Sequence, residues 1–370
     1  MSTLKQIIIK RIEAEGPINF ETFMEMALYY PGLGYYSRSE TTIGREGDFY
    51  TSPHLHPIFG AMMGRQMEEM WQIVGCPEKF TVVEMGAGMG HLAKDMMDYL
   101  RGKDIFPHLE YIIVEMNPFM KAIQAKRVRE YMEKVQWKSS LNDLEPVRGC
   151  FLSNELLDAF PVRVVIMAER MQEVYVSARD GEFEELFMPC CREVMEYFST
   201  FAINLPYGYR SEVNMKIREW IEEVGERLLD GFVLTIDYGY PASVYYDEGR
   251  NRGTLLCYAR HQVHEDPYRN VGEQDLTAHV NFSSLKKWGE DSGLKTLGFC
   301  RQGVYLISLG MDEVISELYG ETPDSFETAK MKGIVLPQGM GDSHKVMVQF
   351  RGGEEQHLRG FVLRNEKEKL

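Results

Sequence analysis

The stretch VVEMGAGMGHLAKD, Val82 to Asp95, decides the fold of this chain. An apolar run ends at three glycines, Gly86, Gly88 and Gly90, and a helical pattern begins directly after them. A buried strand that turns into a helix through glycines points backbone N–H groups and the positive end of the helix dipole at whatever lies above the turn. The stretch therefore predicts a strand-turn-helix unit with a ligand-binding site at the turn.

The spacing of these glycines argues against a nicotinamide dinucleotide as the ligand. The stretch reads G-x-G-x-G, whereas the dinucleotide fingerprint is G-x-G-x-x-G, and His91 occupies the position of the later glycine. Glu115 ends the next predicted strand, where an acid can accept both ribose hydroxyls of a nucleoside. The alternative for Glu115 is a surface acid that caps the helix beginning at Asn117-Pro118.

Short apolar strands alternate with helices around this unit, which is the pattern of a parallel α/β sheet. An Asp180-Gly181 turn predicts a β-hairpin inserted between two core strands. The last residues, RNEKEKL at 364–370, read as a solvated tail. Strands are expected at 80–85, 110–115, 134–138, 150–154 and 232–237. A first helix is expected from Leu4 until a stop at Gly16-Pro17, and further helices at 20–29, 58–74, 91–100, 118–133 and 282–291.

Four segments follow from these patterns. We expect an N-terminal helical lid segment at 1–56, the first half of the core at 57–160, an inserted β-hairpin and helical cap at 161–230, and the rest of the core sheet with C-terminal strands at 231–370.

Composition excludes several classes of function. A net charge of −15 argues against nucleic acid, because such binders present a clustered basic face, and it suits a basic substrate instead. No apolar run approaches the roughly 20 residues of a membrane helix, so no membrane insertion is expected. The N-terminus lacks the features of a signal or transit peptide, and the six cysteines show no C-x-x-C spacing. Both observations favour a cytoplasmic protein with reduced thiols.

Glu84 completes the pattern E-x-G-x-G-x-G, and here the chain resembles the class I S-adenosylmethionine-dependent methyltransferases. In that fold the glycine loop meets the methionine end of S-adenosyl-L-methionine, and an acid after the second strand holds the ribose. Residues after the third strand often contact the adenine, although the segment SSLNDL would also make an ordinary polar loop. The resemblance implies a cofactor site at Glu84, Gly86, Ala87, Gly88, Gly90, Glu115, Met116, Asn142 and Asp143.

A closer resemblance is to the MidA family, which includes a mitochondrial complex I assembly methyltransferase. It implies a class I Rossmann-like sheet with a helical lid and an inserted cap, and methylation of an arginine on a protein such as a respiratory complex I core subunit. It leaves a homodimer open. Six segments occur in the order seen in that family: YYPGLGYYSR, GDFYTSPHLHPIFG, VVEMGAGMGHLAKD, SNELLDAFPV, LTIDYGYP and GEQDLTAHVNF.

Asn154, Glu155 and Asp158 follow the fourth strand, at the sheet edge where ligands bind in open α/β folds. Carboxylates can hold the planar, always charged guanidinium of arginine through paired hydrogen bonds. Glu155 is the first choice for this catalytic role, with the other two in support. The alternative is that Asn154 and Glu155 cap a short helix while Asp158 is solvated.

Two polar segments allow more than one interpretation. The segment GDFYTSPHLHPIFG can be interpreted as a metal site, a ligand lid or the start of a helix. We favour a lid whose Thr51 and Ser52 hydroxyls meet the cofactor's carboxylate. The segment from His261 to Asp266 reads H-x-x-H-E-D, but it lacks the H-E-x-x-H order of a metal site. We expect no metal, and interpret the second segment as a polar loop held by Asp275 and Thr277.

The sequence therefore predicts a protein arginine methyltransferase that uses S-adenosyl-L-methionine. A methyltransferase for a small amine or hydroxyl compound is the nearest alternative. An assembly factor that binds a partner and keeps the cofactor site for stability is another, which the presence of both Glu115 and Glu155 disfavours. A nicotinamide oxidoreductase comes third.

Overall fold

The computed structural model describes residues 3–38, 52–259, 262–320, 324–354 and 356–370. The chain divides into two compact units, each made of segments far apart in the sequence. Residues 240–284, which the sequence analysis placed with the core sheet, cluster with unit 1. Unit 1 comprises Met1–Phe49, Leu157–Glu219 and Tyr240–Ser284, and unit 2 comprises Tyr50–Leu156, Trp220–Gly239 and Leu285–Leu370.

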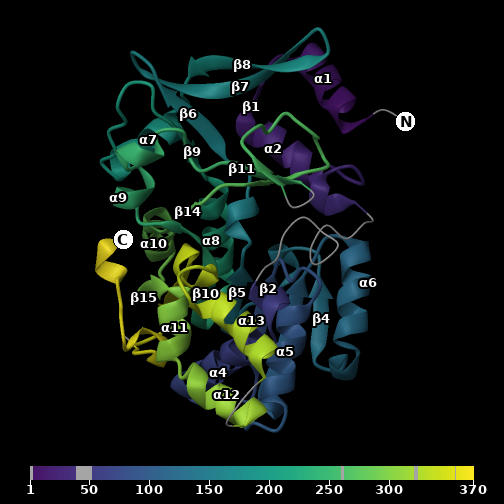
Figure 1. Ribbon diagram of the computed structural model, residues 1–370, viewed down its shortest axis with the longest axis vertical. Helices are drawn as coiled ribbons and strands as arrows, with labels where there is room; N and C mark the ends of the chain where they lie inside the picture. The colour runs from purple at the N-terminus through teal and green to yellow at the C-terminus, as the bar shows by residue number, and fades with distance from the viewer. Residues whose placement is uncertain (1–2, 39–51, 260–261, 321–323, 355) are drawn as a thin grey trace. The chain divides into compact units, whose positions relative to one another are not determined.

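Unit 2 is built around a mainly parallel sheet in the order β15-β16-β10-β5-β2-β3-β4 (Figure 1). The strands from β10 to β4 pair in parallel, whereas β16 is antiparallel to both β10 and β15. All five strands predicted for the core are present, which confirms the α/β class. The bounds are β2 Phe80–Met85, β3 Leu109–Val114, β4 Val135–Lys138, β5 Val147–Asn154, β10 Leu228–Tyr240, β15 Lys295–Arg301 and β16 His344–Arg351.

Among the described residues of unit 2, five helices contribute buried apolar residues to the core that includes this sheet, namely α4, α5, α11, α12 and α13. Helix α6 is shorter than predicted: it ends at Arg127, and a 3-10 turn follows in which the buried Tyr131 donates its hydroxyl to Asp98 Oδ1 at 2.6 Å. The bounds are α3 Ser52–Leu55, α4 Ile58–Ile73, α5 His91–Leu100, α6 Pro118–Arg127, α11 Gln302–Ser308, α12 Met311–Tyr319, α13 Ser325–Val335 and α14 Met340–Ser343. Two helices begin in residues assigned to unit 1 and end in residues assigned to unit 2: α8 Lys216–Arg227 and α10 Phe282–Asp291.

Unit 1 contains an antiparallel sheet in the order β1-β7-β6-β9, with β8 paired to β7. The predicted hairpin at Asp180-Gly181 is confirmed, with left-handed φ angles of 53° and 80° that fit a two-residue turn. The bounds are α1 Leu4–Glu15, β1 Ile18–Asn19, α2 Phe20–Tyr29, β6 Arg163–Met167, β7 Met171–Arg179, β8 Glu182–Pro189, α7 Arg192–Thr200, β9 Arg210–Val213, α9 Ala242–Tyr245, β11 Leu256–Ala259, β12 Gln262–His264, β13 Asp275–Thr277 and β14 Val280–Asn281.

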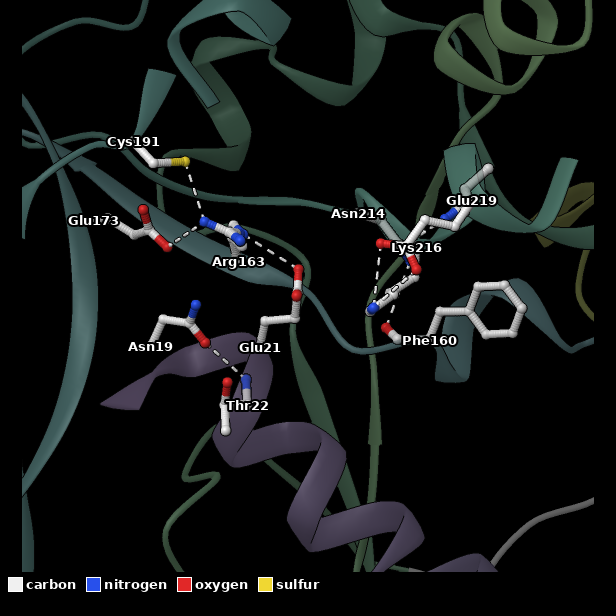
Figure 2. Close-up of polar contacts among 11 residues, drawn as sticks. Asn19, Glu21, Thr22, Phe160, Arg163, Glu173, Cys191, Asn214, Lys216 and Glu219 are labelled. Carbon is white, nitrogen blue, oxygen red and sulfur yellow. Dashed lines mark hydrogen bonds and ion pairs between the residues drawn. The ribbon is translucent and has the colours of Figure 1, made fainter. Parts of the chain in front are cut away.

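Helix α2 of unit 1 is fixed by polar contacts (Figure 2). Asn19 caps α2, as predicted, by accepting the Thr22 backbone N–H at 2.9 Å. Arg163 lies between Glu21 of α2 and Glu173 of β7, at 3.3 Å from each carboxylate, and so ties the helix to the sheet (Figure 2). The N-terminal helices are thus confirmed as helices, and their role as a lid stays a prediction.

The C-terminal residues are largely exposed, as the sequence suggested, but two of them are also tied to β15. Asn365 donates its amide to the Leu297 carbonyl at 2.9 Å, and the Glu366 N–H donates to the Phe299 carbonyl at 2.7 Å. The segment therefore packs along β15, because it supplies hydrogen bonds to backbone groups there. Within the described ranges, no helix has the length and apolar character needed to cross a bilayer.

Candidate active site

The glycine loop joins β2 to α5 at the carboxyl edge of the unit 2 sheet. Gly86, Gly88 and Gly90 have φ angles of 70°, 50° and 78°, a left-handed conformation that side chains with a Cβ rarely adopt. A Cβ on Gly90 would also lie 3.4 Å from Gln124 Cα, so the loop packs closely on α6. The predicted strand-turn-helix unit is confirmed, and the first N–H groups of α5 lie at the end of the loop.

Glu115 lies at the end of the neighbouring strand, β3. Its Oε1 accepts the Asn117 backbone N–H at 2.8 Å, and its Oε2 accepts the Gln124 side-chain amide at 2.9 Å. Burial raises the pKa of Glu115, while these hydrogen bonds oppose the rise. Asn117 is the N-cap of α6, and Glu115 accepts the N–H of this capping residue, so both interpretations of Glu115 stay predictions. Met116, the next predicted contact, is 70% exposed.

Two side chains of α6 that the sequence analysis did not single out reach back to the glycine loop. Gln124 donates to the Gly88 carbonyl at 2.8 Å, and Arg127 donates through Nε to the Met89 carbonyl at 2.8 Å. Arg127 also lies 2.9 Å from His91 Nδ1, and burial with this neighbouring charge lowers the pKa of His91 to about 3. The only sequence signal was their inward position on α6, where a polar residue is unusual.

Glu155 is the most constrained residue at the carboxyl end of β5. Its φ is 50°, and its side chain is 5% exposed. Its Oε1 accepts the Asn154 amide at 3.2 Å and the Ser52 backbone N–H at 3.4 Å, and it lies 3.5 Å from His344 Nε2. Non-glycine residues held in this conformation concentrate at functional sites. His344, from the antiparallel strand β16, could not be placed here from local sequence.

Comparison with known proteins identifies the chain. Residues 62–300 match the family described as "Putative S-adenosyl-L-methionine-dependent methyltransferase". The chain belongs to this family. S-adenosyl-L-methionine is therefore its cofactor, as the sequence predicted, and the nicotinamide alternative is excluded. The left-handed glycines and the partly buried Glu115 fit such a nucleoside cofactor.

Individual relatives cover most of the methyltransferase chain. The mitochondrial protein arginine methyltransferase NDUFAF7 homolog of Drosophila melanogaster is 29% identical, over 96% of this chain and 86% of its own. The Homo sapiens protein arginine methyltransferase NDUFAF7, mitochondrial, is 27% identical, over 90% and 80%. A Burkholderia thailandensis protein solved with bound S-adenosyl-homocysteine has a TM-score of 0.91 and 30% identity, over 99% and 96%. These matches confirm the class I methyltransferase fold and the enzymatic class.

Three predicted cofactor contacts of the methyltransferase have other partners in the structure. Glu84 is 2% exposed and accepts the Tyr111 hydroxyl at 2.8 Å, and burial raises its pKa to about 7. Asp143 closes its own turn by accepting the backbone N–H of Ser140 at 3.0 Å. Asn142 is exposed, and its Oδ1 accepts Arg227 Nη2 at 3.3 Å. Contacts from these residues to the cofactor stay predictions.

Asp158, predicted to support Glu155, is assigned to unit 1. It lies in the 3-10 turn Leu157–Ala159, is 3% exposed, and its carbonyl accepts the Ala278 N–H at 2.9 Å. The alternative that Asp158 is solvated is therefore wrong. In unit 2, Asp237 is fully buried and accepts the Leu156 N–H at 3.2 Å. This hydrogen bond fixes the backbone directly after Glu155.

The segment GDFYTSPHLHPIFG is described only from its sixth residue, so Thr51 lies outside the described residues. The Ser52 hydroxyl accepts the Gln302 side-chain amide at 3.2 Å, a different partner from the cofactor carboxylate that we predicted. The His54 ring lies 4.6 Å from that of His91, which places the segment beside the start of α5. His56 Nε2 lies 2.7 Å from Glu327, so the two histidines have separate partners.

The polar loop of unit 1 is also only partly described, since His261 lies outside the described residues. Asp275 accepts the Tyr36 hydroxyl on both oxygens, at 2.8 and 2.9 Å, and with Thr277 it bounds β13. In the described part of the chain, no three His, Cys, Asp or Glu side chains group as metal ligands would. That no metal is needed stays an expectation.

Proposed function

We propose that this methyltransferase transfers the methyl group to an arginine side chain of a protein. The observation that carries the proposal is the geometry of Glu155, a carboxylate buried at the carboxyl end of β5 on a left-handed backbone. Relatives named as protein arginine methyltransferases support it. The chain's net charge of −15 suits a basic acceptor.

The contacts of Glu155 with the described residues gather on one of its two oxygens. Every contact that the described residues make to this carboxylate, from Asn154, Ser52 and His344, is on Oε1. The buried Asn154 Oδ1 accepts no hydrogen bond from the described residues. Acceptor oxygens on two adjacent residues suit a planar group with several N–H donors, which is the chemistry of a guanidinium.

The cofactor, when bound, supplies a methyl group on an already activated sulfonium, so the protein's task is position and charge. We propose that Gly86, Ala87, Gly88 and Gly90 receive its methionine end and that Glu115 receives its ribose. Glu155 then holds the acceptor nitrogen in line and stabilises the positive charge of the guanidinium as it reacts. Neutralising the acid would remove both effects.

Two further proposals concern the acceptor and the cellular compartment. The acceptor is a homologue of a respiratory complex I core subunit, as the resemblance to the MidA family suggests. The protein is cytoplasmic, which the free state of its cysteines favours. Assembly as a homodimer remains open to measurement by light scattering.

Transfer of a radiolabelled methyl group into a matched cell extract tests the proposed function. We expect one labelled protein band, with the label recovered as methylarginine after hydrolysis, and no labelled band with Glu155→Gln. Label found only in small molecules would contradict the protein acceptor. A Glu155→Gln enzyme that restores a deletion strain without transferring methyl would instead support the assembly-factor alternative.

A further inference from the structure

Gln124 is the one fully buried side chain of α6. The inward position of a surface helix is usually apolar, since burial of an amide is unfavourable unless its polar atoms are paired. Here all of them are. Its Nε2 donates to the Gly88 carbonyl at 2.8 Å and to Glu115 Oε2 at 2.9 Å, and its Oε1 accepts the Trp137 indole N–H at 3.0 Å.

These three contacts fix the orientation of the amide. A flipped amide would turn its oxygen toward two acceptors and its nitrogen toward a donor, which loses all three hydrogen bonds. The same group joins the loop after β2, the acid after β3 and Trp137 on β4. Gln124 therefore fixes the position of the glycine loop relative to Glu115.

We propose that Gln124 is a positioning residue for S-adenosyl-L-methionine, acting through Glu115 and the Gly88–Met89 peptide. With Oε1 of Glu115 bound to Asn117 N–H and Oε2 bound to Gln124, the plane of the carboxylate is fixed. Its remaining lone pairs can then meet two ribose hydroxyls without reorganisation. This inference rests on the role proposed for Glu115.

The contact to the Gly88 carbonyl orients the loop as well. In a trans peptide the C=O and the following N–H point in opposite directions, so a carbonyl held by Gln124 turns the Met89 N–H away from α6. Gly90 contributes to the same arrangement, because its φ of 78° is a conformation that residues with a Cβ rarely adopt. One buried amide thus orients two groups of the proposed cofactor site, the Met89 N–H as a donor and the Glu115 carboxylate as an acceptor.

Calorimetric titration with S-adenosyl-homocysteine tests the inference on wild type, Gln124→Leu, Glu115→Gln and the double variant. We expect each single change to weaken binding roughly 10- to 100-fold, as loss of a hydrogen bond to a charged group does. The double variant should bind more weakly than Glu115→Gln, but by less than the product of the two single effects, because the changes share the Gln124–Glu115 hydrogen bond while the Gly88 contact is lost separately. In turnover, the KM for the cofactor should rise while the KM for the acceptor is unchanged.

Two controls separate positioning from folding. Gln136→Leu removes an exposed hydrogen bond to Glu110 Oε1 of 2.9 Å and should leave the affinity unchanged. If Gln124→Leu fails to fold, Gln124→Met, of similar length, replaces it. Wild-type affinity in the Gln124 variant, or full additivity in the double variant, would overturn the inference. Wild-type affinity in Glu115→Gln would instead overturn the role proposed for Glu115.

Discussion

At Glu155 we expect a local loss of stability to accompany the catalytic role that we propose. A left-handed backbone is unfavourable by roughly 1–2 kcal/mol for a residue with a Cβ, and Glu155 has a φ of 50°. We expect Glu155→Gly to unfold at an equal or higher temperature than wild type, since the relief of strain offsets the lost hydrogen bonds. Methyl transfer should nevertheless fall at least 100-fold, as expected when a group that orients the reactants is removed.

Asp180 provides the matched control for this prediction. Its φ of 53° is similar, but it lies at the tip of the β7–β8 hairpin. Asp180→Gly should raise the unfolding temperature and leave methyl transfer unchanged. If Glu155→Gly retained methyl transfer, Glu155 would have no role in the mechanism.

The raised pKa of Glu84 predicts that the free energy of unfolding depends on pH. Burial raises its pKa from 4.5 to about 7, against a hydrogen bond from Tyr111 that lowers it. Between these two values the unfolded chain loses a proton that the folded protein retains, so stability falls as pH rises from about 4.5 to about 7. Above that window the loss is complete and amounts to at most about 3 kcal/mol.

Glu84→Gln cannot lose this proton. Urea unfolding of both proteins without cofactor, at pH values below and above the window, measures the difference. We expect the variant to gain stability relative to wild type at the higher pH. A difference between the two proteins that is the same at both pH values would show that Glu84 ionises normally in the fold.

At the scale of elements, the close packing of α4 against α5 depends on a glycine, which has no side chain. A Cβ on Gly60 would lie 2.4 Å from Asp95 Cβ, so the two helices meet closely there. Alanine normally favours a helix over glycine by about 1 kcal/mol. We expect Gly60→Ala to destabilise instead, by roughly 1–3 kcal/mol, because the helices must separate. Gly333 of α13, with its nearest neighbour at 3.8 Å, is the control, and Gly333→Ala should stabilise. Thermal unfolding distinguishes the two signs.

The elements that could be predicted carry their signals locally. The β2 strand, its glycines and α5 lie within one short stretch, and Asn19 caps α2 through a residue three positions away. The early end of α6 and the packing of the C-terminal segment depend on partners distant in sequence. Gln124 was missed for the same reason, since its polarity has meaning only once Gly88, Glu115 and Trp137 surround it.

At the scale of the whole molecule, the course of the chain between two units was the least predictable feature. Residues 240–284 have the same strand and helix patterns as the core, yet they belong to unit 1. Periodicity reports which face of an element is buried, but not which unit buries it. The antiparallel insertion of β16 between β10 and β15, which places His344 near Glu155, is likewise a long-range pairing without a local signal.

The net charge of −15 gives a prediction for the molecule as a whole. If the acceptor is a basic protein, long-range attraction speeds its association, and salt screens that attraction over about 10 Å at 0.1 M. We expect kcat/KM for the acceptor protein to fall several-fold to roughly tenfold between about 20 and about 200 mM NaCl, mainly through KM. The affinity for S-adenosyl-homocysteine, a small molecule whose amine and carboxylate nearly cancel, should change little over the same range. Steady-state kinetics and calorimetry at matched salt concentrations measure the two quantities. A kcat/KM that is independent of salt would contradict steering of a basic acceptor, and a parallel loss of cofactor affinity would place the salt effect at the cofactor site instead.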